Sequence, residues 1–133
     1  FEITETAAIS HLEDAKKFIR TLQSLGAKFA LDDFGSGLSS FGYLKTLPVD
    51  FLKIDGGLIK NLVREPSDLS IVKCVNDVAH MLGMQTIAEF VEDQQTLESL
   101  KSLGIDYVQG YGIEKPKSLK GPSPRDAEIH ASR

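Results

Sequence analysis

The sequence has 133 residues and a mass of 14.6 kDa, the size of one domain. Its 15 Lys and Arg against 19 Asp and Glu give a net charge of −4, which excludes the broad positive surface that sequence-independent nucleic-acid binding requires. No apolar run approaches the roughly 20 residues that span a bilayer, and the single cysteine, Cys74, cannot form an internal disulfide. We therefore expect a cytoplasmic globular domain, and leave open whether a longer parent protein is anchored in a membrane.

Hydrophobic periodicity divides the chain into short apolar strands that alternate with amphipathic helices. In chain order we predict a strand over 1–4, a helix over 11–25, a strand over 27–31, a helix over 39–47, a strand over 51–54, a helix over 67–82, a strand over 86–88, a helix over 94–103 and a strand over 106–108. Such alternation indicates parallel βαβ units with right-handed crossovers. Because the chain begins within a strand pattern and without methionine, we expect it to be part of a longer protein.

Polar residues stand where each of the five predicted strands ends. They are Glu2, Asp32, Asp33, Lys53, Glu89 and Gln109. The carboxyl ends of parallel strands form the active-site edge of both a (β/α) barrel and an open doubly wound sheet, and the pattern alone leaves both architectures open. The alternative interpretation is that each polar residue only begins a solvated loop. This interpretation accounts for any single position, but it accounts poorly for polar residues at the ends of five successive strands. No glycine-rich phosphate-binding motif of the dinucleotide or Walker type occurs.

The acids in this set predict a cation site. Several carboxylates without neighbouring His or Cys suit hard cations such as Mg²⁺, Mn²⁺ or Ca²⁺. Lys53 would stay charged and hold a water, a phosphate or a carboxylate. Together these residues favour metal-dependent chemistry on a phosphate-bearing substrate. The alternative is a set of loop carboxylates on a metal-free binding domain.

The histidines and the cysteine are expected to have structural or surface positions. His11, His80 and His130 have no metal-ligand spacing. Cys74 is expected to pack beside the inward-facing apolar stripe of helix 67–82. That stripe consists of Ile71, Val75, Val78 and Leu82.

Five segments in order carry a resemblance to a known family. They are Glu2-Ile3-Thr4-Glu5, Asp32-Asp33-Phe34-Gly35-Ser36-Gly37, Leu52-Lys53-Ile54-Asp55, Ala88-Glu89-Phe90-Val91-Glu92 and Gln109-Gly110-Tyr111. Over residues 1–119 the chain resembles the EAL domain, which hydrolyses the bacterial second messenger cyclic di-GMP to linear pGpG. The resemblance implies an α/β fold, the C-terminal part of a TIM-like (β/α)8 barrel with about five strands. It makes residues 1–120 a partial EAL domain, whereas the Pro, Ser and charge content of residues 121–133 predicts a flexible tail.

The resemblance also implies a role for each matching position. It implies a two-metal site for Mg²⁺ or Mn²⁺, with the ligands Glu2, Asp32, Asp33 and Glu89. It assigns catalytic roles to Lys53, Glu89 and Gln109, where Lys53 holds the attacking water and offsets phosphate charge. Supporting acids would be Glu5, which braces the loop after the paired aspartates, and Glu92. The loop facing the substrate or a dimer partner would be Phe34, Gly35, Ser36 and Gly37.

Several departures from the family pattern bear on activity. The family's Glu-x-Leu motif and a metal-binding Asn would lie upstream of Phe1, so the 133 residues alone are expected to be weakly active or inactive. Phe90 stands where glycine is common, and Leu38 replaces the usual aromatic residue. We expect the chain to associate with the missing barrel half or to form a homodimer through residues 39–47 and 58–63. The alternatives are a non-catalytic cyclic di-GMP receptor and an unrelated metal-dependent barrel acting on another phosphate ester.

Overall fold

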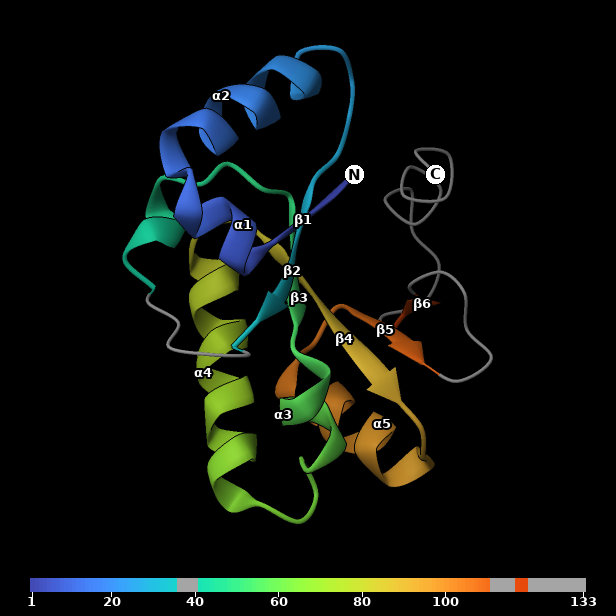
Figure 1. Ribbon diagram of the computed structural model, residues 1–133. Coiled ribbons are helices and arrows are strands. Elements are labelled where there is room, and N and C mark those ends of the chain that lie inside the picture. Colours follow the sequence, from blue (N-terminus) through green and yellow to red (C-terminus); the bar gives the residue numbers. More distant parts are fainter. Residues whose placement is uncertain (36–40, 111–116, 120–133) are drawn as a thin grey trace.

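A single sheet of six strands, in the order β1-β2-β3-β4-β5-β6, runs through the protein (Figure 1). The computed structural model describes residues 1–35, 41–110 and 117–119. The strands are β1 (Glu2–Thr4), β2 (Ala30–Phe34), β3 (Phe51–Ile54), β4 (Gln85–Val91), β5 (Tyr107–Gly110) and β6 (Lys117–Ser118). The first five are parallel, each paired with the next in the chain, whereas β6 is antiparallel to β5.

The strand order distinguishes between the two architectures that the sequence leaves open. A doubly wound sheet reverses its strand order at a switch point, whereas a barrel adds each strand beside the previous one. Here the order follows the chain without reversal, as in a segment of a barrel. The prediction of five parallel strands from the C-terminal part of a barrel is confirmed, and the short strand β6 is an addition that the sequence did not predict.

The helices cross between the strands and bury one face of the sheet. They are α1 (Glu5–Ser10), α2 (Leu12–Gln23), the 3-10 helix η1 (Tyr43–Lys45), α3 (Gly56–Lys60), α4 (Pro66–Met81) and α5 (Gln94–Leu103). Leu31 and Leu52 belong to the large core cluster that includes buried helix residues such as Ile19 and Val75. On the opposite face a smaller cluster takes one side chain from each of four strands, namely Ala30, Phe51, Ile87 and Tyr107. This second face is the interior of the barrel segment.

Local caps stabilise two short helices, of which α1 was not predicted and α3 overlaps in part the segment 58–63 that the family resemblance places in a helix. In α1, the Thr4 hydroxyl accepts a hydrogen bond from the Ala7 N–H at 3.2 Å. In α3, the Asp55 carboxylate caps the Gly57 N–H at 2.9 Å, although the Gly-Gly pair at the helix start opposes helix formation. The helix predicted over 39–47 is represented, in the described part, only by η1. Residues 36–40 and the predicted tail 121–133 lie outside the described residues.

The buried face of α4 is shifted by about one residue from the predicted one. The buried residues of this helix are Val72, Val75, Asn76 and Ala79, whereas Ile71 is 45% exposed. Cys74 is also exposed, contrary to the prediction. A polar anchor explains the rotation, because the buried Asn76 amide donates to the Leu103 carbonyl at 3.0 Å and accepts from the Thr86 hydroxyl at 2.6 Å.

The histidine on α4 has the structural position that the sequence indicated. His80 Nε2 lies 2.6 Å from the buried Asp106 carboxylate, which also accepts the Thr86 N–H at 2.9 Å. This network ties α4 to the amino ends of β4 and β5. Of the helices in the described ranges, none is both long enough and apolar enough to cross a bilayer.

Candidate active site

Two strands carry an irregularity at their carboxyl ends, and each contains predicted site residues. The β2–β3 register shifts between Leu31 and Phe34, and the β4–β5 register shifts between Ala88 and Val91. Within these bulges Asp33 has a φ of 58° and Phe90 a φ of 59°, the left-handed region that non-glycine residues rarely occupy. Such strain tends to occur at functional sites, where the surrounding structure holds it.

The bulge in β2 corrects the predicted position of the paired aspartates. The sequence placed a strand over 27–31 with the aspartates after it, whereas β2 covers Ala30–Phe34 and contains both. In a regular strand Asp32 and Asp33 would point to opposite faces. The left-handed backbone at Asp33 removes that alternation, so both carboxylates reach the same place.

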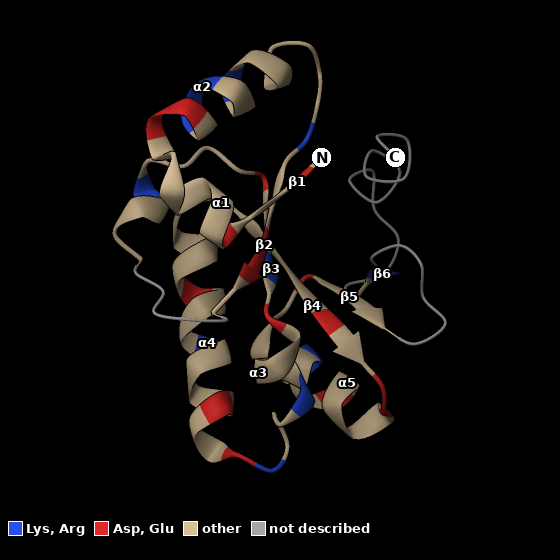
Figure 2. Cartoon of the chain, in the orientation of Figure 1, with Lys and Arg blue, Asp and Glu red and all other residues tan. Residues whose placement is uncertain are grey.

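Three carboxylates meet at this end of the sheet. One oxygen each of Asp32, Asp33 and Glu89 lies within 4.8 Å of the others, although β3 separates the two strands that carry them. Figure 2 shows the acidic segments of β2 and β4 at this edge. Burial and the negative charges of Asp32 and Asp55 raise the pKa of Asp33, and burial raises that of Glu89 against the opposing effect of Lys53. All three donors are hard oxygens, so the group fits a divalent cation such as Mg²⁺ or Mn²⁺.

A buried lysine lies beside these carboxylates. The side chain of Lys53 on β3 is 3% exposed, and its Nζ lies 2.5 Å from Glu2 Oε1 and 3.1 Å from Glu89 Oε1. Burial alone would lower the pKa of Lys53, but the hydrogen bonds and charges of Glu2 and Glu89 outweigh it and raise the pKa. Lys53 is therefore a fixed positive charge at neutral pH.

Glu2 contacts the site through Lys53, and its role as a metal ligand stays a prediction. We predicted it as a metal ligand, but the three-carboxylate group found among the described residues does not include it. Its carboxylate instead pairs with Lys53, the nearest cationic group at the end of β3.

Glu5 holds two segments together behind the aspartates. Only 5% exposed, its carboxylate accepts the Gly35 N–H at 3.4 Å and the Tyr43 hydroxyl. Gly35 lies two residues after Asp33, and its φ of +95° disfavours any other residue. An added Cβ would also lie 2.8 Å from Leu58 Cδ1, so the Leu58 side chain would have to shift. Tyr43 was missed, because nothing in the spacing of the motifs pairs it with Glu5.

An aromatic residue lies at the rim of the site. Phe90 is 62% exposed, and its ring lies against Gly56, where an added Cβ would be 2.0 Å from Phe90 Cδ2. Gly56 is a second residue that could not be predicted, because a glycine at the start of a helix does not indicate that an aromatic ring packs against it. The contact joins α3, which follows the lysine strand, to the bulge that carries Glu89.

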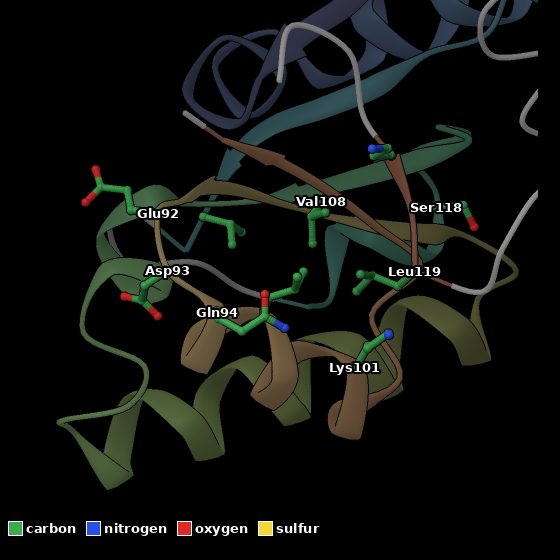
Figure 3. A pocket seen from close by; sticks show the side chains of 10 residues that line it. Glu92, Asp93, Gln94, Lys101, Val108, Ser118 and Leu119 are labelled. Carbon is green, nitrogen blue, oxygen red and sulfur yellow. The ribbon is translucent and has the colours of Figure 1, made fainter. Parts of the chain in front are cut away.

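The remaining predicted residues are dispersed. Gln109 lies at the carboxyl end of β5, the same edge of the sheet as the three carboxylates. Glu92 is exposed beyond the end of β4 and lines a separate cavity of about 570 Å³ between α5, β5 and β6 (Figure 3). Phe34 and Gly35 directly follow the aspartates, whereas Ser36 and Gly37 lie outside the described residues.

Comparison with known proteins shows the family of this chain. The family model of the EAL domain matches residues 1–116. The chain is 50% identical over 119 residues to cyclic di-GMP phosphodiesterase PdeB of Shewanella oneidensis and 44% identical over 119 residues to PdeF of Escherichia coli. These matches cover 90% of the chain in each case, but only 14% and 16% of those proteins.

Solved structures show the same fold. The chain matches the PaMucR phosphodiesterase in complex with c-di-GMP with a TM-score of 0.79 and 34% identity, covering 90% of this chain and 48% of that one. It matches the EAL domain of Mycobacterium smegmatis DcpA with a TM-score of 0.77 and 34% identity, covering 99% and 58%. The protein is therefore of the TIM-like barrel class, and the candidate site lies at the carboxyl ends of its strands. It belongs to the EAL domain family, and the chain spans about half of these solved EAL structures.

Proposed function

We propose that this chain is the C-terminal half of an EAL domain, residues 1–120 with a tail over 121–133, in a protein that hydrolyses cyclic di-GMP to linear pGpG. The observation that carries the proposal is the convergence of Asp32, Asp33 and Glu89 within 4.8 Å, beside the buried ammonium group of Lys53. A carboxylate cluster repels a phosphodiester unless cations lie between them. The named activity of the relatives PdeB and PdeF supports this substrate.

Each site residue has a role that its position supports. Asp32, Asp33 and Glu89 would hold the Mg²⁺ or Mn²⁺ ions. When bound, such ions neutralise charge on the phosphate and lower the pKa of water. Lys53 would offset the negative charge of the phosphate, and its ion pairs hold the carboxylates of Glu2 and Glu89 in place. Gln109 lies at the same edge and would orient the substrate by hydrogen bonding.

We place Glu2 in the metal site only when the missing half of the domain is present. Its side chain is 40% exposed on the edge strand β1, so it can turn from Lys53 toward a cation held partly by upstream residues. We also propose that the protein acts in the cytoplasm, where an exposed free thiol such as Cys74 remains reduced. A homodimer through residues 39–47 and 58–63 stays part of the proposal.

The decisive experiment changes Asp32→Ala in the protein that carries the complete domain. Hydrolysis of cyclic di-GMP is measured by chromatography of pGpG with Mg²⁺, with Mn²⁺ and with a chelator. We expect a loss of more than about 100-fold, since removing a direct ligand costs more than the 10–100-fold typical of groups that only support ligands. The matched control is Asp14→Ala on α2, an exposed acid that should leave the rate unchanged.

Two results would contradict the proposal. Full activity of Asp32→Ala removes the metal assignment. Tight binding of cyclic di-GMP by the unmodified protein without any turnover, in either metal, assigns it to the receptor class instead.

A further inference from the structure

Tyr43 contacts Phe34, directly after the paired aspartates, and Glu5 on α1. Its ring packs against Phe34 with centroids 6.4 Å apart and planes tilted by 47°. Its hydroxyl donates a hydrogen bond to Glu5 Oε2. Tyr43 lies on η1, the element that follows β2 in the chain, so these contacts join η1 to the end of β2 and to α1.

The carboxylate of Glu5 is shared between the two segments. Oε2 accepts the Tyr43 hydroxyl, and Oε1 accepts the Gly35 N–H at 3.4 Å. Glu5 is only 5% exposed, so water has little access to its carboxylate to replace the Tyr43 hydroxyl or the Gly35 N–H as a hydrogen-bond donor. Burial first, and then the hydrogen bond and charge of Glu5, raise the pKa of Tyr43 far above its usual value, so the hydroxyl remains a donor throughout the physiological range.

Gly35 is two residues from the strained position in the site. The left-handed backbone of Asp33 places its carboxylate with those of Asp32 and Glu89, and strain of this kind persists only when neighbouring contacts hold it. The Glu5 contact to the Gly35 N–H is such a contact, and the Tyr43 hydroxyl fixes the orientation of Glu5.

We propose that Tyr43 is a positioning residue for the cation site: through Glu5 and the Gly35 N–H it holds the turn that brings Asp33 beside Asp32 and Glu89. The proposal rests on the proposed function in one respect, that these carboxylates bind a divalent cation. It adds a residue outside the five motif segments, acting from η1 on the geometry of the ligands.

The test is Tyr43→Phe in the protein that carries the complete domain, because this change keeps the ring on Phe34 and removes only the hydroxyl. Mn²⁺ binding to metal-depleted protein is measured by calorimetry, and hydrolysis of cyclic di-GMP is measured over a range of Mn²⁺ concentrations. We expect Mn²⁺ affinity to fall about 10-fold, the lower end of the effect of groups that support metal ligands. High Mn²⁺ should restore most of kcat, and the KM for cyclic di-GMP should change little.

The matched control and a second variant separate positioning from general stability. Thr21→Val also removes a hydroxyl, one that donates to the Lys17 carbonyl on the exposed face of α2, and should leave Mn²⁺ affinity unchanged. Glu5→Gln should weaken Mn²⁺ binding by itself. Adding Tyr43→Phe to it should then cause a smaller loss than in the unmodified protein, because both changes act through one carboxylate.

Each outcome bears on the proposal. Unchanged Mn²⁺ affinity in both Tyr43→Phe and Glu5→Gln overturns it, even if their melting temperatures fall. Losses that add independently in the double variant overturn the path through Glu5. If the unmodified protein binds no Mn²⁺, both the cation site and the positioning role of Tyr43 are wrong. If the unmodified protein binds Mn²⁺ normally and Tyr43→Phe has no effect on the affinity, only the positioning role is wrong.

Discussion

At the scale of single residues, the site depends on one buried positive charge. Lys53 lies between Glu2 and Glu89, and it is the cation that compensates these two carboxylates in the described structure. A buried ion pair is not a large source of stability, because desolvation offsets most of the attraction. Removing Lys53 alone is destabilising, because the carboxylate of Glu89 would remain half-buried beside Asp32 with no compensating charge.

Lys53→Met is therefore expected to be costly for both stability and activity. We expect the free energy of unfolding to fall by about 3 kcal/mol, the lower end for breaking a buried pair, because Glu2 is partly exposed and can turn to solvent. Hydrolysis of cyclic di-GMP should fall with it. Urea unfolding and the pGpG assay measure the two effects.

A matched lysine provides the control for this prediction. Lys73 pairs with Asp77 at 3.2 Å on the exposed surface of α4, and Lys73→Met should change the free energy of unfolding by less than about 0.5 kcal/mol. Equal stability of the two variants would show that Lys53 does not hold the carboxylates together.

At the scale of elements, the ends of β4 and β5 approach each other unusually closely. Val91 is paired with Gly110 beyond the bulge that contains Glu89 and Phe90. A Cβ at Gly110 would lie 2.0 Å from the Val91 carbonyl oxygen, so a side chain there collides with backbone. Backbone cannot swing aside as a side chain can, and the geometry of the bulge therefore requires glycine at this position.

Gly110→Ala should disturb the site through this contact. The strand ends must separate, so we expect a destabilisation of about 1–3 kcal/mol, typical of overpacking, and weaker Mn²⁺ binding as Glu89 shifts. The control is Gly26→Ala, which meets no atom within 4 Å but has a φ of +94° that also disfavours a Cβ. It should lower the melting temperature without changing Mn²⁺ affinity. The same Mn²⁺ affinity in both variants would contradict the link between Gly110 and Glu89.

At the scale of the whole molecule, the barrel segment has open edges. In the described residues β1 pairs only with β2, and beyond β5 lies only the two-residue strand β6. Aromatic side chains are exposed near β1: Phe1 is 67% and Phe18 55% exposed, and both rings contact Phe29. Open edges and exposed apolar surface favour association. The chain covers 48% and 58% of two solved structures that it matches, so each of those chains extends beyond the matched part.

The 133 residues alone are accordingly expected to self-associate. Sedimentation velocity at micromolar concentration should show dimers or larger species, and Phe18→Glu should shift the distribution toward smaller ones. Met81→Glu replaces another exposed apolar residue, on α4 rather than beside β1, and should have little effect. A folded monomer that Phe18→Glu does not change would show that the edge at β1 needs no partner.

The local pattern of the chain predicts elements that depend on neighbours in sequence. Helix α5 has the predicted bounds, because Asp93 caps the Thr96 N–H at 2.7 Å and Gly104 ends the helix with a φ of +86°. The five parallel strands follow from short apolar runs between helices. The orientation of α4 could not be predicted, because it depends on the hydrogen bonds of Asn76 to Thr86 on β4 and to Leu103 at the end of α5, which are distant in the chain.

The same division applies to the site. The sequence by itself determined which residues stand at strand ends and that their oxygens suit a divalent cation, since residue type and spacing are local properties. Only the tertiary structure decided that Asp32 and Asp33 reach the same place, that Glu2 pairs with Lys53, and that Tyr43 lies behind the turn. These depend on strand pairing, a left-handed residue and buried charge, each of which is set by segments that meet only when the chain folds.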